Sequence, residues 1–175
     1  MGAGKSSVGR ALSQHLGWTF EDLDERIERR EQRKVSEIFR DSGEVEFRRA
    51  EHAALRELLS ELRAGVQRVA ALGGGAFAQR GNARLMRAAG IPTVFLDAEV
   101  NELWRRCRQQ ALEQEAERPL LTNLESFREL YLRRRPHYLK ATLQQDTGGK
   151  SIEEIAGEVI RALGLSPNRR RRGKN

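Results

Sequence analysis

The chain has 175 residues, 33% of them charged and 38% hydrophobic, which is the size and balance of one soluble, helix-rich domain. It has no apolar run near the roughly 18 residues of a membrane-spanning helix and does not open on a basic-then-apolar leader, and its single cysteine, Cys107, excludes an internal disulfide, so we expect a cytoplasmic protein. The net charge of +7 is concentrated in the last residues without aromatic neighbours, which argues against a nucleic acid partner.

Residues 2–6 read Gly-Ala-Gly-Lys-Ser, the second half of the phosphate-binding pattern G-x-x-x-x-G-K-[ST]. Gly2 and Gly4 permit backbone angles at which successive N–H groups point at phosphate oxygens, and a helix that begins near Lys5 adds its own N-terminal donors. Apolar residues at helical spacing follow at once. The pattern predicts a phosphate loop in which Lys5 reaches the β- and γ-phosphates and Ser6 binds Mg²⁺. The alternative is a glycine-rich terminus before an ordinary helix.

The next predicted elements are a short strand near 18–20 and a charged helix over about 25–33, with Asp22-Leu23-Asp24 between them. Two carboxylates beside a magnesium–nucleotide loop can divide the work, because one can face the metal and the other a substrate hydroxyl. The other interpretation is an acidic turn that caps the following helix. The sequence leaves both open.

A short helix that ends near Gly43 and a longer one over about 44–63 come next. Apolar spacing predicts an inner face for the longer helix that includes Arg48 but not Arg49; its members are Val45, Arg48, His52, Leu55, Leu59 and Leu62. A cation on an inward face needs a partner, because an unpaired buried charge is costly. Arg48 therefore either bonds an internal carboxylate or holds an anionic substrate, and a carboxylate matches the guanidinium fork. His52 is predicted to be structural.

Residues 68–72 form a predicted buried strand that ends in Gly73-Gly74-Gly75, which is either a tight turn or a place where backbone N–H groups approach a ligand. A helix over about 79–89, a strand over 92–96 and a helix from about 99 with Cys107 on its apolar face follow. The polar segment over about 110–124 contains Arg118-Pro119. In a phosphate-loop enzyme this predicts a mobile lid that brings Arg118 to the transferred phosphoryl group; the alternative is a surface loop.

The last elements are a helix over about 125–135 ended by Pro136, a strand over 141–145 and a helix with apolar positions at ideal spacing from Ile152 to Leu163. Arg134 lies on the inner face of the first of these helices, and Arg133 and Arg135 lie off it. We expect one domain over residues 1–165 and a disordered basic tail over 166–175.

Strands that alternate with helices predict an α/β fold, with a parallel sheet covered by helices on both faces to give three layers. Ligands of such sheets bind at the carboxyl ends of the strands. The phosphate loop, the Asp22–Asp24 segment and the three glycines all fall at such ends, so we expect them to converge.

Together these residues resemble the shikimate kinase family over nearly all of residues 1–165. The resemblance rests on GAGKSSVGR at 2–10, DLD at 22–24, SGEVEFRR at 42–49, LGGG at 72–75, RPLL at 118–121 and RRPHY at 134–138. It implies a P-loop kinase fold of the nucleoside-monophosphate-kinase type, with strand order 2-3-1-4-5. It also implies transfer of the γ-phosphoryl group of ATP to the 3-hydroxyl of shikimate, in the pathway to chorismate and the aromatic amino acids.

The resemblance implies a role for each matching residue. The ATP phosphates would be held by Gly2, Ala3, Gly4, Lys5, Ser6 and Ser7, and the adenine side would contact Arg106 and Lys150. The metal shell would include Ser6 and Asp22. The shikimate site would be formed by Asp24, Arg48, Gly74 and Arg134.

Catalysis would depend on Lys5, on Asp24 as the group that takes the proton, and on Arg118 of the lid. Mg²⁺ is then the implied metal and ATP the co-substrate. The expected partners are the two small-molecule substrates, and we expect a monomer that uses neither membrane nor nucleic acid.

Two features depart from the family pattern. The first strand and the first loop glycine would precede Met1, so we expect strand 1 to be absent here, the start to lie at an internal methionine, and this chain to fold poorly or act weakly. The stretch from Arg106 to Arg118 is longer than usual, which affects the lid geometry. The alternatives are another small-metabolite P-loop kinase such as gluconate kinase, a catalytically weak truncated homologue, or a non-catalytic nucleotide- or nucleic-acid-binding protein.

Overall fold

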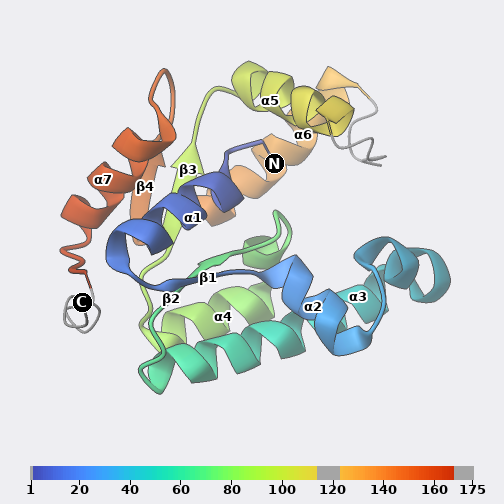
Figure 1. Cartoon of the computed structure of the whole chain (residues 1–175). Helices are drawn as coiled ribbons and strands as arrows, with labels where there is room; N and C mark the ends of the chain where they lie inside the picture. The colour runs from blue at the N-terminus through green and yellow to red at the C-terminus, as the bar shows by residue number, and fades with distance from the viewer. Residues whose placement is uncertain (1, 114–122, 168–175) are drawn as a thin grey trace. The chain divides into compact units, whose positions relative to one another are not determined.

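The computed structural model describes residues 2–113 and 123–167, with helices and strands in the predicted order (Figure 1). The chain divides into two compact units. Among the described residues, the first unit consists of 2–8, 92–113 and 123–164, and the second of 9–91 and 165–167. Helix α1 (Lys5–Leu16) begins in the first unit and continues in the second. None of the helices in the described ranges is long and apolar enough to cross a membrane.

The second unit is built on two parallel strands, β1 (Thr19–Asp22) and β2 (Arg68–Ala71), with Thr19 opposite Arg68 and Asp22 opposite Ala71. Its helices are α2 (Leu23–Glu31), α3 (Val35–Arg63) and α4 (Arg80–Ala89), with a short 3₁₀ turn at Ala76–Ala78. Two strands alone are marginally stable, and the buried core of this unit is formed mainly by apolar side chains of these helices. The fully buried side chains of this core include Leu23, Ile27, Ala54 and Leu55.

Helix α3 joins the two helices predicted on either side of Gly43. Gly43 has φ 76° and ψ 177°, which is not helical, so the helix kinks there, and the rings of Phe39 and Phe47 pack across the kink at 4.4 Å between centroids. Val45 was predicted on the inner face, and that prediction is wrong: its side chain is 81% exposed. Phe47 is the residue buried in this turn, and two residues that are two positions apart point to nearly opposite sides of a helix. From Arg48 onward the predicted face does point inward, and Leu55 and Leu59 are buried.

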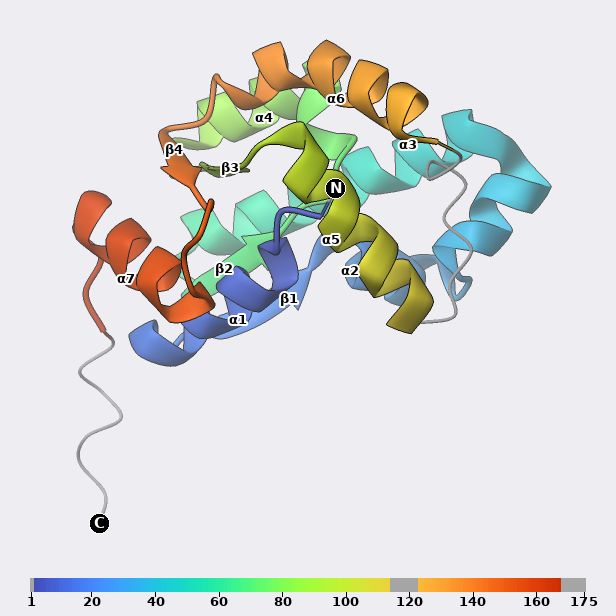
Figure 2. The ribbon, with the colours of Figure 1, turned by 90° about the horizontal axis from the view of Figure 1, so that it is seen from above.

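The first unit has its own parallel pair, β3 (Val94–Asp97) and β4 (Leu143–Asp146), with Asp97 opposite Asp146. The helices are α5 (Val100–Glu113), α6 (Leu124–Tyr138) and α7 (Ile152–Ala162). Figure 2 shows β3 beside β4, and the first residues of the chain running beside α5. Trp104 of α5 packs edge-on against the fully buried Phe127 of α6, with 5.3 Å between the ring centroids.

The prediction that α6 ends before Pro136 is wrong, because the helix continues to Tyr138. A proline costs most in a helix interior, where its missing N–H and its ring disturb the preceding turn. Pro136 lies in the last turn, which is closed beyond it by the N–H of Leu139 donating to the carbonyl of Arg135 at 3.0 Å.

The strand pairing matches the expected order. The order 2-3-1-4-5 without its strand 1 leaves the pairs 2-3 and 4-5, and in the described residues β1 pairs with β2 and β3 pairs with β4. Each pair places its carboxyl ends together. Asp22 and Ala71 end one pair, and Asp97 and Asp146 end the other.

Candidate active site

The glycine loop before α1 has the backbone that its sequence predicts. Gly2 and Gly4 have φ angles of 62° and 73°, a region that side chains disfavour. A Cβ on Gly2 would lie 2.3 Å from the carbonyl oxygen of Leu103 and 2.9 Å from Sγ of Cys107, so α5 leaves room only for glycine. Lys5 is the first residue of the 12-residue helix α1, whose N-terminal N–H groups and dipole favour an anion.

The acidic segment after β1 forms the start of α2. Asp22 is the N-cap, and its side chain accepts a hydrogen bond from the backbone N–H of Asp24 at 3.0 Å. The capping interpretation of this segment is therefore confirmed for Asp22. Asp24 lies in the first turn of α2, with Oδ1 only 3.0 Å from the point where a Cβ on Gly73 would lie.

Arg48 lies against the same glycine turn. A Cβ on Gly75 would be 2.7 Å from one terminal nitrogen of Arg48 and 2.8 Å from the other. The carboxylate of Asp24 and the guanidinium of Arg48 thus reach Gly73 and Gly75, two residues apart on one turn. The second unit therefore brings together the predicted Asp24, Arg48 and the three glycines that include Gly74.

Two carboxylates on the same helix, one buried and one exposed, balance the charge of Arg48. Glu51 is 1% exposed and lies 3.1 Å from Arg48, and Glu44 lies 3.0 Å from it. The alternative that Arg48 bonds an internal carboxylate is thus confirmed, although 21% of its side chain stays exposed. Glu51 was missed at the sequence level, although its position three residues after Arg48 on one helix face pointed to it.

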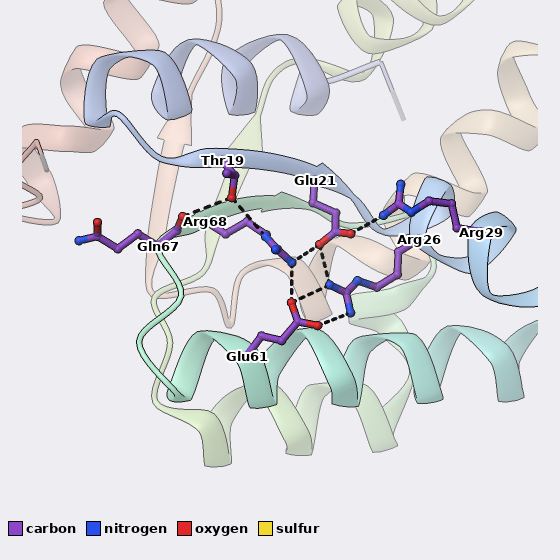
Figure 3. Close-up of polar contacts among 7 residues, drawn as sticks. All are labelled: Thr19, Glu21, Arg26, Arg29, Glu61, Gln67 and Arg68. Carbon is purple, nitrogen blue, oxygen red and sulfur yellow. Dashed lines mark hydrogen bonds and ion pairs between the residues drawn. The ribbon is translucent and has the colours of Figure 1, made fainter. Parts of the chain in front are cut away.

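Five charged side chains form a cluster around Glu21, the residue before Asp22 (Figure 3). Glu21, with a side chain only 9% exposed, pairs with Arg26 at 2.8 Å, Arg29 at 2.5 Å and Arg68 at 2.5 Å. Glu61 of α3 pairs with Arg26 and Arg68 in turn. Burial by itself raises the pKa of Glu21, but the hydrogen bond and charge of Arg26, with the charges of Arg68 and Arg29, outweigh it, so the pKa lies below its ordinary 4.5.

In the first unit, Arg134 of α6 lies near Tyr138, which ends the same helix. Burial raises the pKa of Tyr138, and the nearby Arg134 charge opposes part of that rise. Arg135, predicted to lie off the inner face, pairs instead with Asp97 at 2.7 Å. That prediction is wrong because the end of β3 supplies a partner that helical spacing cannot reveal. Arg133 is exposed as predicted.

The two residues predicted on the adenine side are both paired with carboxylates. Arg106 lies 2.8 Å from Glu102 and donates to the side chain and backbone carbonyl of Thr147, both at 3.2 Å. The hydrogen bond from Arg105, followed by that from Arg106, lowers the pKa of Glu102 to about 2 against the effect of burial. Lys150 lies 2.8 Å from Glu158.

The structure places the predicted site residues in two groups. The second unit holds Asp22, Asp24, Arg48 and Gly74, and the first holds the loop residues up to Ser7 with Arg106, Arg134 and Lys150. Arg118 lies outside the described residues. In the ranges 2–113 and 123–167, no group of three or more His, Cys, Asp or Glu side chains is arranged to hold a metal ion.

Comparison with known proteins identifies the family. The family model for shikimate kinase matches residues 1–164. This chain belongs to the shikimate kinase family. The resemblance drawn from the motifs is therefore confirmed.

Relatives of the shikimate kinase family match most of the chain. The shikimate kinase of Cereibacter sphaeroides is 40% identical over 171 residues, covering 96% of this chain and 81% of that relative. That of Persephonella marina is 35% identical over 161 residues, covering 91% of this chain and 92% of that relative. As members of one family, they are ATP-dependent kinases, and so is this chain.

Solved structures confirm the predicted α/β P-loop kinase fold. The shikimate kinase of Acinetobacter baumannii, solved in complex with shikimate, superposes with a TM-score of 0.81 at 32% identity and covers 93% of this chain and 88% of its own. The enzyme of Aquifex aeolicus gives 0.78 at 34% identity, covering 94% and 92%.

Proposed function

We propose that this protein transfers the γ-phosphoryl group of ATP to the 3-hydroxyl of shikimate, giving shikimate 3-phosphate and ADP. One observation carries the proposal beyond family membership. A carboxylate, Asp24, and a guanidinium, Arg48, lie against one glycine turn at Gly73 and Gly75. This arrangement suits a small acceptor that has both hydroxyl groups and a carboxylate.

Arg48 and Asp24 would bind different groups of the acceptor substrate. Arg48 would bind the substrate carboxylate together with Arg134 and the backbone of Gly74, because the guanidinium fork matches a carboxylate bidentately. The buried Glu51 and the exposed Glu44 both pair with Arg48 and hold it in place. Asp24 would accept hydrogen bonds from the substrate hydroxyls and take the proton of the attacking one.

The residues that bind ATP, the phosphoryl donor, would act by aligning its phosphates and by stabilising their negative charge. Phosphoryl transfer passes through a loose transition state, so catalysis consists mainly of alignment and stabilisation of charge on the phosphoryl oxygens. Lys5 and the N–H groups that open α1 would hold the β- and γ-phosphates, and Arg118 would add a further positive charge. Arg106 and Lys150 would lie on the adenine side.

The oxygen donors fit Mg²⁺. The hydroxyl of Ser6 and the carboxylate of Asp22 are hard oxygen ligands of the kind that Mg²⁺ prefers when it is bound mainly through substrate phosphates. When bound, the ion neutralises negative charge on the phosphates. Asp22 also caps α2, which holds its carboxylate at the end of β1.

A product assay tests the function. Purified protein with ATP and Mg²⁺ should release ADP when shikimate is added and should give a product heavier by one phosphoryl group. Gluconate is the matched acceptor, since it also carries a carboxylate and hydroxyls. ADP release with gluconate but not with shikimate would reassign the substrate.

We further infer a cytoplasmic monomer that works without nucleic acid. Support comes from the lone Cys107 and from the absence of aromatic residues near the basic residues 169–174. Size-exclusion chromatography with light scattering tests the monomer. Salt-sensitive retention on RNA or DNA that is lost on deleting residues 169–175 would contradict the last part.

A further inference from the structure

Asp97, the last residue of β3, bonds two other parts of the first unit, helix α6 and the residue that follows β4. Its carboxylate accepts a hydrogen bond from the hydroxyl of Tyr131 at 2.5 Å through one oxygen and pairs with Arg135 at 2.7 Å through the other. Both partners belong to α6. Since they are four residues apart, they lie on one face of that helix.

The backbone carbonyl of Asp97 holds a second group. It accepts hydrogen bonds from the N–H of Thr147 at 2.9 Å and from its hydroxyl at 3.0 Å. Thr147 is fully buried just after β4. It in turn accepts two hydrogen bonds from Arg106 of α5, one on its hydroxyl and one on its carbonyl.

The electrostatics keep this network intact at neutral pH. Burial, followed by the hydrogen bond and charge of Asp97, raises the pKa of Tyr131 to about 12, so its hydroxyl remains a donor. Arg135 balances the Asp97 charge, so the carboxylate is not left unpaired at a site where only 23% of its side chain is exposed.

These contacts determine the orientation of two arginines. Tyr131 lies three residues before Arg134 and Arg135 directly follows it, so anchoring both fixes the rotation of α6 and hence the direction of Arg134. Thr147 does the same for Arg106, because a long side chain with two fixed acceptors keeps one rotamer.

We propose that Asp97 is a positioning residue that aligns Arg134 through its carboxylate and Arg106 through its carbonyl and Thr147. This rests on the proposed function, in which Arg134 binds the shikimate carboxylate and Arg106 the adenine side of ATP. The Arg134 branch of this network starts at the Asp97 carboxylate, and the Arg106 branch starts at the Asp97 backbone carbonyl. They are therefore separable by substitution.

The test is a split in KM between the two substrates. Tyr131→Phe removes one hydroxyl and Asp97→Asn removes the carboxylate charge but keeps the backbone carbonyl, so each should raise the KM for shikimate about three- to tenfold and leave the KM for ATP within about twofold. Thr147→Val removes the hydroxyl of the other branch. It should raise the KM for ATP by a similar factor and spare that for shikimate.

Two controls match these variants. Thr142→Val removes a hydroxyl that accepts from the N–H of Thr93 at 3.1 Å, at the amino ends of the same strand pair, and Arg133→Gln changes an exposed charge beside Arg134. Both should leave both KM values unchanged. Equal rises in both KM values for the three test variants, or no rise in any, would overturn the proposal.

The outcome separates this proposal from the proposed function. A wild-type protein that binds ATP but does not phosphorylate shikimate would refute the function and the Arg134 branch with it. In that case, the affinity for ATP measured without an acceptor tests whether Thr147 positions Arg106. An affinity in Thr147→Val equal to that of the wild type would overturn this part of the proposal. If Asp97→Asn does not fold, Tyr131→Phe decides the carboxylate branch.

Discussion

A single missing methyl group lets Arg48 lie where it does. The guanidinium lies against Gly75, and a Cβ there would come within 2.7 Å of it. Gly75 itself has φ −93° and ψ −22°, which alanine adopts readily. The glycine is therefore required by the neighbouring arginine and not by its own backbone.

Gly75→Ala should fold normally and bind shikimate poorly. The added methyl pushes aside the flexible end of Arg48, and a lost charged hydrogen bond corresponds to about tenfold or more in affinity. Steady-state kinetics should show a higher KM for shikimate with little change for ATP. Gly81→Ala is the control, because its Cβ would lie 3.5 Å from His52, an ordinary contact. A KM for shikimate that is the same in both variants would contradict this account.

Lys5→Met should reduce turnover about 10²- to 10³-fold, the range for removing one charge-stabilising donor. Lys5 stands at the start of α1, where its ammonium group would meet the transferred phosphate. The thermal melt should move little, since methionine is also a good helix former. Lys34→Met, at a side chain that is 72% exposed, should leave turnover unchanged. Turnover retained in Lys5→Met would remove this lysine from the phosphate site.

At the scale of elements, the charged cluster around Glu21 ties together four of them. Glu21 comes from β1, Arg26 and Arg29 from α2, Glu61 from α3 and Arg68 from β2 (Figure 3). Glu21 immediately precedes Asp22, so the cluster holds the segment that carries Asp22 and Asp24. The side chains of Glu21, Arg26 and Arg68 are largely buried, so removing one member of this network should be costly.

The cluster should make the free energy of unfolding depend on pH in the acidic range. The pKa of Glu21 is lowered in the folded state, so its stabilising contribution is complete above its ordinary value of about 4.5 and is lost as the pH falls below that. Glu21→Gln should lower the free energy of unfolding at pH 7 by about 1–3 kcal/mol and flatten its fall between pH 5 and 3. Urea unfolding across this pH range measures both.

Glu57→Gln is the matched control for the cluster. Glu57 also links α3 to α2, through Arg30, but its side chain is 49% exposed, and exposed pairs contribute little. Its unfolding free energy should stay within about 0.5 kcal/mol of the wild type. Should the two variants lose the same stability, the buried cluster has no special role.

At the scale of the whole molecule, the described residues of each unit form two parallel strands, fewer than an isolated sheet needs for stability. Substrates that bind only the folded chain add stability by mass action, about 2.7 kcal/mol at one hundred times the dissociation constant. Magnesium ATP and shikimate should therefore each raise the melting temperature.

Removing Mg²⁺ should affect the stabilisation by ATP but not the stabilisation by shikimate. With EDTA in excess, turnover should stop and most of the stabilisation by ATP should disappear, because Mg²⁺ carries the phosphate contacts. The stabilisation by shikimate should persist, since its proposed ligands are arginines and Asp24. Turnover that survives EDTA would argue against the Mg²⁺ requirement. Melting curves and ADP release on the same samples decide this.

The amino-acid sequence by itself determined the order of the elements, the glycine loop before α1, the break between two helical segments at Gly43 and the inward direction of Arg48. These features depend on neighbours within about one helical turn, or on the backbone freedom of glycine, and such local chemistry is legible in the chain. The motif order also determined the family.

Only the tertiary structure decided the partners of Glu21, the position of Arg135 against Asp97, and the hold of Thr147 on Arg106. In each case at least one of the partners lies dozens of residues away in the chain. Helical or strand periodicity predicts which face a side chain occupies, but not which charged residue of another element pairs with it. That is set by the packing of one element on another, which the local sequence does not encode.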